Sequence, residues 1–132
     1  MTTHTIIHPE GWLPAKGYAN GVLTKDGTLH IGGQIGWDAN KQFASDGFVD
    51  QMHQALRNIV AIVEAAGGKA SDVTRLTWFV TDKHDYLAHQ VEVGAAYRDV
   101  FGKHFPAMSM LVVADLIEDR AVVEIEATAH LP

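Results

Sequence analysis

Residues 105–129 read FPAMSMLVVADLIEDRAVVEIEATA, and the pattern of this stretch is the most informative about the fold. Two apolar runs rich in β-branched residues flank a short polar segment, which is the pattern of two strands separated by a turn. We therefore expect the two runs to form strands that pair with each other at the end of the chain.

The second apolar run alternates with the period of two that a strand requires. One face carries Ala121, Val123, Ile125, Ala127 and Ala129, and the other carries Val122, Glu124, Glu126 and Thr128. An ionised carboxylate needs water, a paired cation or a wet cleft around it, because unpaired burial is too costly. The face that carries the two glutamates is therefore either a solvated outer face or a cleft.

The first third of the chain predicts strands and turns. We expect a strand over 3–8 and a hairpin of strands 18–24 and 28–31, because Asp26-Gly27 lies between two strand-like runs. The glycine-rich segment 32–37 lacks the spacing of a phosphate-binding loop. Its glycines are expected to let the backbone approach another group closely.

Two helices and one strand are predicted in the middle of the chain. Apolar residues recur at helical spacing over 48–66, after Ser45 or Asp46 as a cap, with Gln51 and Asn58 on the polar side. A strand over 71–80 follows. The second helix has Asp82 or Asp85 as its cap, carries Leu87, Val91, Gly94, Tyr97 and Phe101 at helical spacing, and stops at Gly102.

This order of elements predicts an α+β fold in which two helices cover one face of a mixed sheet. The opposite face would then carry Met108, Met110, Val112 and Val122. Burying these four side chains would contribute about 6–10 kcal/mol per chain. We therefore expect this face to self-associate in an obligate oligomer, with polar clefts where Glu124 and Glu126 lie.

The composition narrows the functional class. A chain of 132 residues fits one domain, and its net charge of −6 with a pI near 5.7 argues against nucleic-acid binding. No apolar run is long enough for a membrane span, and the first residues lack the pattern of a signal peptide, so we expect a cytoplasmic protein. Cysteine is absent, and the eight histidines show no metal-ligand spacing, so we expect no metal and no cofactor.

Four segments agree in order and spacing with one known family. They are Lys16-Gly17-Tyr18-Ala19-Asn20-Gly21-Val22, His30-Ile31-Gly32-Gly33-Gln34-Ile35, Pro106-Ala107-Met108-Ser109 and Val123-Glu124-Ile125-Glu126-Ala127. They resemble the reactive-intermediate (enamine/imine) deaminases, the Rid or YjgF-type family, over nearly the whole chain. The resemblance implies a chorismate-mutase-like α+β fold, with one Rid-family domain over 1–132. It also implies a homotrimer that binds a small-molecule ligand in a cleft between each pair of subunits.

The resemblance also implies roles for individual residues. The expected catalytic residues are Glu124, which would orient or deprotonate the attacking water, and Tyr18, which would shape the pocket. The expected substrate-binding residues are Gly32, Gly33, Met108, Ser109 and Met110. Active family members hydrolyse 2-imino or 2-enamino acids to 2-oxo acids and ammonia, and no cofactor is implied.

One departure from the family pattern affects the expected activity. Met108 occupies the position of the arginine whose planar fork binds the substrate carboxylate. Methionine has no hydrogen-bond donor, so activity on ordinary 2-imino acids should be weak or absent. Three hypotheses remain: an enzyme acting on a different imine, enamine or carbonyl compound, a non-catalytic metabolite-binding trimer, and a structural or partner-binding trimer.

Overall fold

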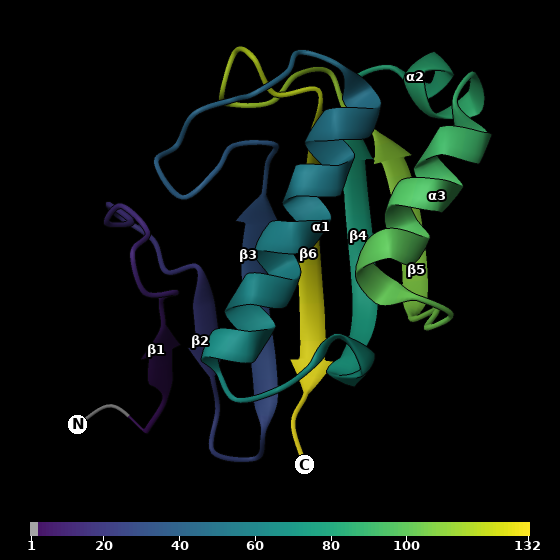
Figure 1. The fold of residues 1–132 in the computed structure, drawn as a ribbon. Coiled ribbons are helices and arrows are strands. Elements are labelled where there is room, and N and C mark those ends of the chain that lie inside the picture. Colours follow the sequence, from purple (N-terminus) through teal and green to yellow (C-terminus); the bar gives the residue numbers. More distant parts are fainter. Residues whose placement is uncertain (1–2) are drawn as a thin grey trace.

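Six strands form one mixed sheet in the order β1-β2-β3-β6-β4-β5 in the computed structural model, which describes residues 3–132 (Figure 1). The elements are β1 (Thr5–Ile7), β2 (Gly21–Leu23), β3 (Thr28–Gln34), α1 (Phe48–Ala65), a 3-10 turn (Ala70–Asp72), β4 (Val73–Val80), α2 (Lys83–Leu87), α3 (Gln90–Phe101), β5 (Ala107–Val112) and β6 (Val123–His130). Neighbouring strands run antiparallel except β4 and β5, which are parallel. The predicted α+β class with a mixed sheet is confirmed.

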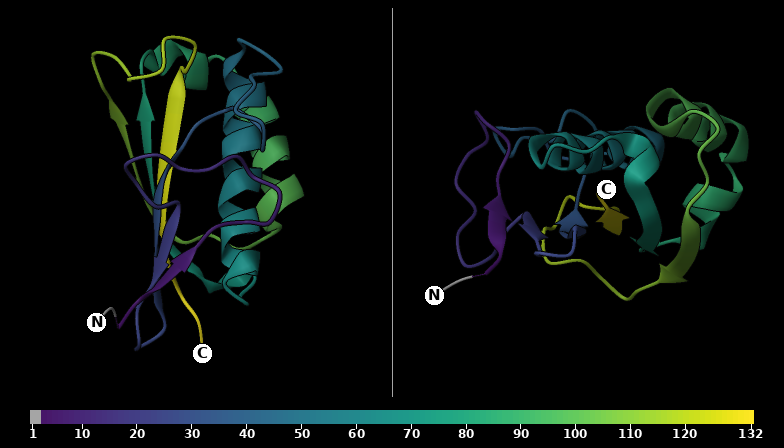
Figure 2. Two further views of the ribbon diagram at one scale, coloured as in Figure 1. Left: turned by 90° about the vertical axis from the view of Figure 1, so that its left-hand side faces the viewer. Right: turned by 90° about the horizontal axis from the view of Figure 1, so that it is seen from below.

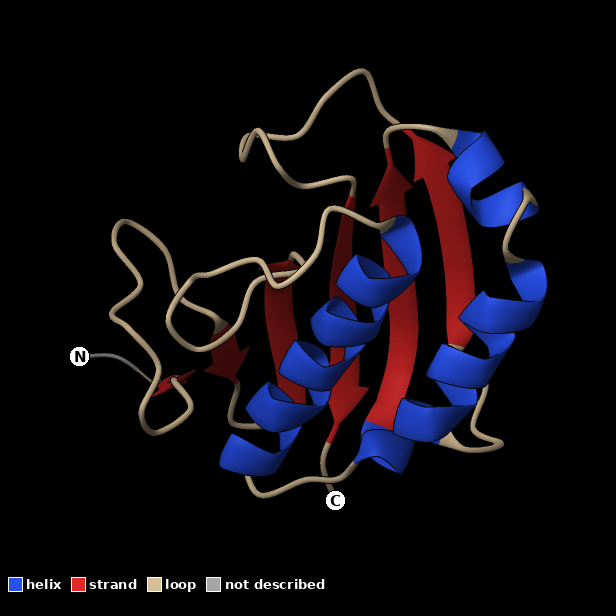
Figure 3. Cartoon of the chain, turned by 45° about the horizontal axis from the view of Figure 1, so that its top comes forward, coloured by secondary structure: helices blue, strands red, loops and turns tan. Residues whose placement is uncertain are grey.

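Helices α1 and α3 cover one face of this sheet, as predicted (Figures 2 and 3). The apolar stripe of α1 and the inward side of β6 meet in the core. The core-facing residues of β6 are all buried, and so is Ala121, two residues before the strand begins. These strand residues are Val123, Ile125, Ala127 and Ala129. The period-two alternation predicted for this strand is therefore confirmed. None of the helices within 3–132 has the length and apolar composition of a membrane-spanning segment.

The predicted second helix is divided into α2 and α3. Asp82 caps α2, accepting a hydrogen bond from the His84 amide at 2.9 Å, and the helical dihedrals end before His89. This interruption changes the helical phase, so Leu87 and Val91 are exposed rather than packed on the sheet. The buried face of α3 consists instead of Val93, Ala96, Tyr97 and Phe101.

The last two apolar runs do not pair with each other, so this prediction from the sequence is wrong. Strand β4 lies between them, parallel to β5 on one side and antiparallel to β6 on the other. A parallel neighbour requires a crossover connection, which α2 and α3 provide between β4 and β5. The polar segment 113–122 then passes from β5 to β6 beyond the end of β4.

The predicted facing of β5 is also wrong. Its register with β4 places Met108 beside Leu76, and Met110 beside Trp78. Paired residues point to the same side of a sheet, and Leu76 and Trp78 are buried under the helices. The two methionines therefore lie on the helix-covered face, as does Val112 beside Val80.

Strand β5 is nonetheless only partly covered, because it lies at the edge of the sheet. Met108 is 47% exposed and Val112 is 56% exposed. Glu124 pairs with Phe79, which is on the opposite, helix-free face. Met108 and Glu124 therefore lie on opposite faces of the sheet within one chain.

Two residues assigned to the polar side of the first helix are buried. Gln51 donates to the carbonyls of Ser45 (3.1 Å) and Arg120 (2.9 Å), and accepts from the Val122 amide at 2.9 Å. Asn58 donates to the carbonyls of two residues that follow β3, Ile35 and Trp37. These amides hold irregular segments whose buried backbone groups need partners.

The N-terminal cap of α1 differs from the prediction as well. Gly47 occupies the cap position and no side chain accepts a hydrogen bond from the first turn. Ser45 instead accepts from the Gly47 amide at 2.9 Å, and Asp46 forms an ion pair with Arg120. The predicted capping residues therefore order the loop before the helix rather than the helix itself.

Gly36→Ala is expected to lower the free energy of unfolding by about 1–3 kcal/mol, because it overpacks a tight contact. A Cβ atom at Gly36 would lie 2.6 Å from the Cα of Gln51, and a helix backbone cannot move away cheaply. Denaturant unfolding measures the change. Gly47→Ala is the control, since its Cβ would meet only the Ser45 hydroxyl, at 3.3 Å. Equal unfolding midpoints for Gly36→Ala and the unmodified protein would contradict the contact.

Candidate functional site

Four of the seven predicted site residues line one pocket on the helix-free face. Tyr18, Gly32, Gly33 and Glu124 surround a cavity of about 370 Å³, which we call the Glu124 pocket. Its other lining residues are Ala19, Asn20, Gln34, Ile35, Trp37, Ile117 and Glu118. The structure thus brings together residues that are more than 100 positions apart in the chain.

Gly33 makes room for the Glu124 carboxylate. The pairing of β3 with β6 shifts between Ile31 and Gln34, which places Gly32 and Gly33 in a bulge. A Cβ atom at Gly33 would lie only 2.5 Å from Oε2 of Glu124, so any larger residue would displace the carboxylate. The prediction that glycines here allow a close approach is confirmed.

The pKa of Glu124 is raised above its ordinary value of 4.5. Burial of the carboxylate is the main cause, and the negative charge of Glu126, two residues along the same face, is the second. A carboxyl group whose pKa is raised in a pocket is a stronger base than one in water. This is the property that a general base needs.

A buried amide network holds the floor of the Glu124 pocket. Gln34 donates to the side-chain oxygen of Asn20 at 3.2 Å and to the carbonyl of Gly32 at 3.1 Å, and the Gly32 amide donates to the Asn20 carbonyl at 2.9 Å. The sequence did not predict that Asn20 and Gln34 line the pocket. Their polar side chains gave no signal that distinguishes a buried amide from an exposed one.

The rim of the pocket carries a cation near Tyr18. Tyr18 is half-exposed, and the Lys41 ammonium lies 5.9 Å from the centre of its ring and 5.6 Å from that of Trp37. Lys41 also donates to the Pro14 carbonyl at 3.0 Å, which fixes its side chain across the loop. Lys41 thus lies at the rim beside Tyr18 and Trp37, and no motif in the sequence connects it to Tyr18.

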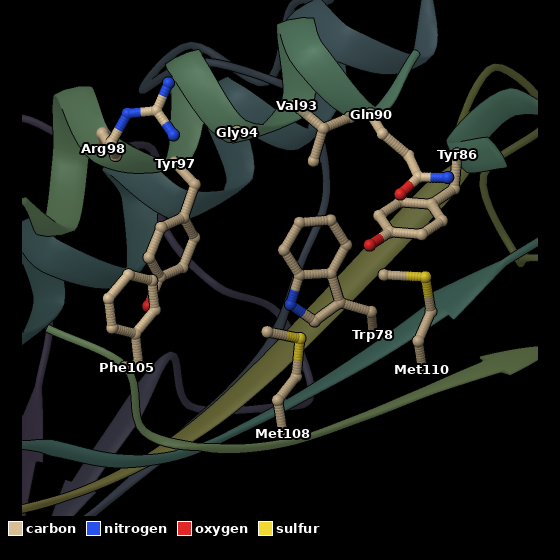
Figure 4. A pocket seen from close by; sticks show the side chains of 10 residues that line it. All are labelled: Trp78, Tyr86, Gln90, Val93, Gly94, Tyr97, Arg98, Phe105, Met108 and Met110. Carbon is tan, nitrogen blue, oxygen red and sulfur yellow. The ribbon is translucent and has the colours of Figure 1, made fainter. Parts of the chain in front are cut away.

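The remaining predicted residues lie elsewhere. Met108 and Met110 line a second cavity, between α3 and the β4–β5 edge, which we call the α3 pocket (Figure 4). Ser109 lines neither pocket; it pairs with Thr77 and faces the helix-free side. Within one chain, therefore, the structure does not bring Met108, Ser109 or Met110 to Glu124.

The sequence comparisons identify the family. The model of the endoribonuclease L-PSP family matches residues 10–131. The chain belongs to this family, the Rid or YjgF-type proteins. A goat (Capra hircus) protein named 2-iminobutanoate/2-iminopropanoate deaminase is 38% identical over 113 residues, which cover 85% of this chain and 78% of the relative. A protein of the same name from Salmonella typhimurium is 40% identical over 100 residues, which cover 74% of each chain.

Solved structures of Rid proteins share the fold. The protein called RidA from an Antarctic Psychrobacter species superposes with a TM-score of 0.81 at 30% identity, covering 96% of this chain and 99% of that one. A structure described as a putative endoribonuclease L-PSP, from Entamoeba histolytica, superposes with a TM-score of 0.84 at 27% identity, covering 97% and 99%. The Rid membership and fold expected from the sequence are confirmed, and imine deaminases are among the relatives of this chain.

Proposed function

We propose that this protein hydrolyses the carbon–nitrogen bond of an imine or enamine to a carbonyl compound and ammonia. The observation that carries the proposal is Glu124, a half-buried carboxylate with a raised pKa that lies against Gly33 in a pocket. The names of the relatives, 2-iminobutanoate/2-iminopropanoate deaminases, support the same reaction type.

The residues of the Glu124 pocket suit the steps of such a hydrolysis. Glu124 takes a proton from water as the water oxygen attacks the carbon of the C=N bond, and it passes this proton to the nitrogen, which becomes an amine. The hydroxyl group of this adduct then gives its proton, through Glu124, to the amine, which leaves as ammonia while the C=O bond forms. Tyr18 and the exposed backbone of Gly32 and Gly33 bind the substrate next to this carboxylate.

A complete site requires two copies of the chain, because Met108 and Met110 lie on the face opposite Glu124. A homotrimer in which the Glu124 pocket of one subunit adjoins β5 of the next would unite them. Several exposed apolar side chains support such contacts. Ile117, at the Glu124 pocket, is 99% exposed, and Leu111, on the helix-free face of the edge strand β5, is 47% exposed.

We expect light scattering after size exclusion to show a trimer at micromolar concentration. Leu111→Asp is expected to dissociate it, because it would place a charge in an apolar interface. Val91→Asp is the control, since Val91 is 81% exposed on α3, in the helix layer on the other face. A monomeric unmodified protein, or dissociation by Val91→Asp alone, would contradict this arrangement.

Met108 indicates that the substrate carries no carboxylate at the end that lies against this side chain. A thioether cannot pair with a carboxylate, so desolvation of that charge would remain uncompensated. The same residue favours a second candidate, a trimer that binds a metabolite without turning it over.

Ammonia release above the uncatalysed rate tests the proposed reaction. One substrate is 2-iminobutanoate, generated in situ by an amino-acid oxidase. The other is the neutral imine of 2-butanone, generated from 2-butylamine by an amine oxidase. We expect faster turnover of the neutral imine than of 2-iminobutanoate. Binding of both compounds without any acceleration would overturn the enzymatic function and favour the metabolite-binding trimer.

A further inference from the structure

The α3 pocket, about 200 Å³ in volume, has walls that are largely aromatic or thioether side chains. Trp78 lies at its centre, with Met108 and Met110 of β5 on one side and α3 on the other (Figure 4). Tyr97 and Phe105 stack at one end, with ring centres 5.7 Å apart and planes 9° from parallel. Sulfur and aromatic groups of this kind contact a planar ring favourably.

One hydrogen-bond donor in this pocket has no partner. Trp78 is 1% exposed, and its indole Nε1 is the one buried side-chain nitrogen or oxygen within residues 3–132 that makes no hydrogen bond. Figure 4 shows this nitrogen on the edge of the indole toward Met108 and the Tyr97–Phe105 stack. Buried tryptophan N–H groups ordinarily find an acceptor, and leaving one unpaired is unfavourable.

The surrounding residues explain why no acceptor is supplied by the chain itself. Met108 and Met110 offer only thioether sulfur, a weak acceptor. The Tyr97 hydroxyl donates to the His104 carbonyl at 2.6 Å and accepts no hydrogen bond from Trp78. A ligand atom that accepts from Nε1 would satisfy the donor.

Gly94 leaves this space open on the α3 side. A Cβ atom there would meet only the end of the Arg98 side chain, at 3.3 Å from a guanidinium nitrogen. Arg98 is the one charged side chain among the lining residues, and it is exposed at the mouth of the pocket on α3. The other polar groups of the lining, the Tyr86 hydroxyl and the Gln90 amide, are neutral like Trp78 Nε1, and this environment suits a neutral acceptor better than a carboxylate.

We propose that the α3 pocket binds a neutral aromatic carbonyl group, with its ring against Met108 and Met110 and its oxygen accepting a hydrogen bond from Trp78 Nε1. This inference rests on the proposed function, since it names the part of the substrate or product that Met108 contacts. It assigns Trp78 and Gly94 as residues that determine specificity.

Acetophenone, a neutral aryl ketone, is the probe for this site. Titration of ¹⁵N-labelled protein follows the three indole N–H signals, and Trp78→Phe assigns the one that belongs to Trp78. We expect the Trp78 signal to move downfield and saturate, while those of Trp12 and Trp37 stay in place. A Trp78 signal that does not move at high acetophenone concentration would overturn the proposal.

Two ligands of similar shape separate the contribution of the acceptor from that of charge. Ethylbenzene keeps the ring but has no acceptor, and we expect it to bind about three- to tenfold more weakly than acetophenone. Benzoate carries a full negative charge and should bind weakest of the three. Equal binding of ethylbenzene would exclude the Trp78 hydrogen bond, and tightest binding of benzoate would show that Arg98 selects an anion instead.

A matched pair of α3 variants tests the location. Gly94→Leu fills the pocket and should weaken acetophenone binding by at least about tenfold. Ala95→Leu adds the same side chain at the next, exposed position of α3, and should leave binding unchanged. Unaltered binding to Gly94→Leu would overturn the proposal. The titration needs no turnover, so the absence of deaminase activity would not overturn the proposal for the α3 pocket. Turnover of a neutral imine without acetophenone binding would overturn that proposal and leave the proposed reaction in place.

Discussion

Glu124→Gln is expected to lower the turnover of the best imine substrate by about 10²–10⁴-fold, because it removes the proposed general base. Glutamine keeps the size of the side chain and its space above Gly33, so the trimer should persist. Steady-state ammonia release measures the loss, and light scattering checks the assembly. Unchanged turnover would end the catalytic role, and dissociation without a kinetic defect would indicate a role in assembly.

Glu126→Gln is the matched control for this loss of turnover. Glu126 is exposed on the same face of β6 and raises the pKa of Glu124 through its charge, after the larger effect of burial. The proposed base acts when ionised, so the rate should fall as the pH drops through the raised pKa. Removing the charge of Glu126 lowers that pKa, and the fall should move to lower pH with the plateau rate preserved.

The stability of the Glu124→Gln variant separates the two roles further. The pKa of Glu124 is raised in the folded state, so the ionised carboxylate is less favourable there than in the unfolded chain. The free energy of unfolding therefore falls as the pH rises from the ordinary pKa of the group through the raised one. Removing the charge should therefore maintain or raise the free energy of unfolding at pH 7. A marked loss would indicate that Glu124 is a structural ion-pair partner.

Met108→Arg is expected to raise kcat/KM for 2-iminobutanoate by about 10- to 100-fold. A bidentate hydrogen bond to a charged carboxylate contributes about 1.5–3 kcal/mol, and each 1.4 kcal/mol is a factor of about ten. The edge position of Met108, which is 47% exposed, leaves room for the longer side chain. The substitution should also weaken acetophenone binding, because it places a charge in the apolar wall.

Val91→Arg is the control for added charge. It introduces the same group on α3, at an 81% exposed position that lines neither pocket. We expect no gain of activity from it. Equal gains from both variants would mean that general electrostatic attraction raises the rate. No gain from Met108→Arg in a folded trimer would mean that the pocket differs from that of the relatives in more than this residue.

The features that depend on local periodicity could be predicted from the sequence alone. The alternation of β6 identified the face of Glu124, and the helical spacing identified α1 to within about one residue at its C-terminal end. The Asp26-Gly27 turn identified the β2–β3 hairpin. In each case the pattern repeats along one continuous segment, so neighbouring residues carry the information.

Which segments are neighbours in space could be learned from the folded chain but not from the sequence pattern. The insertion of β4 between β5 and β6 reversed the expected facing of Met108, because register with a distant strand determines which side an edge residue faces. The burial of Gln51 depends likewise on loop carbonyls up to 69 residues away. Such pairings join residues that are far apart in the chain, and the periodicity of the sequence does not predict them. For the same reason the separation of Met108 from Glu124, and the unpaired Trp78 N–H, emerged only from the folded chain.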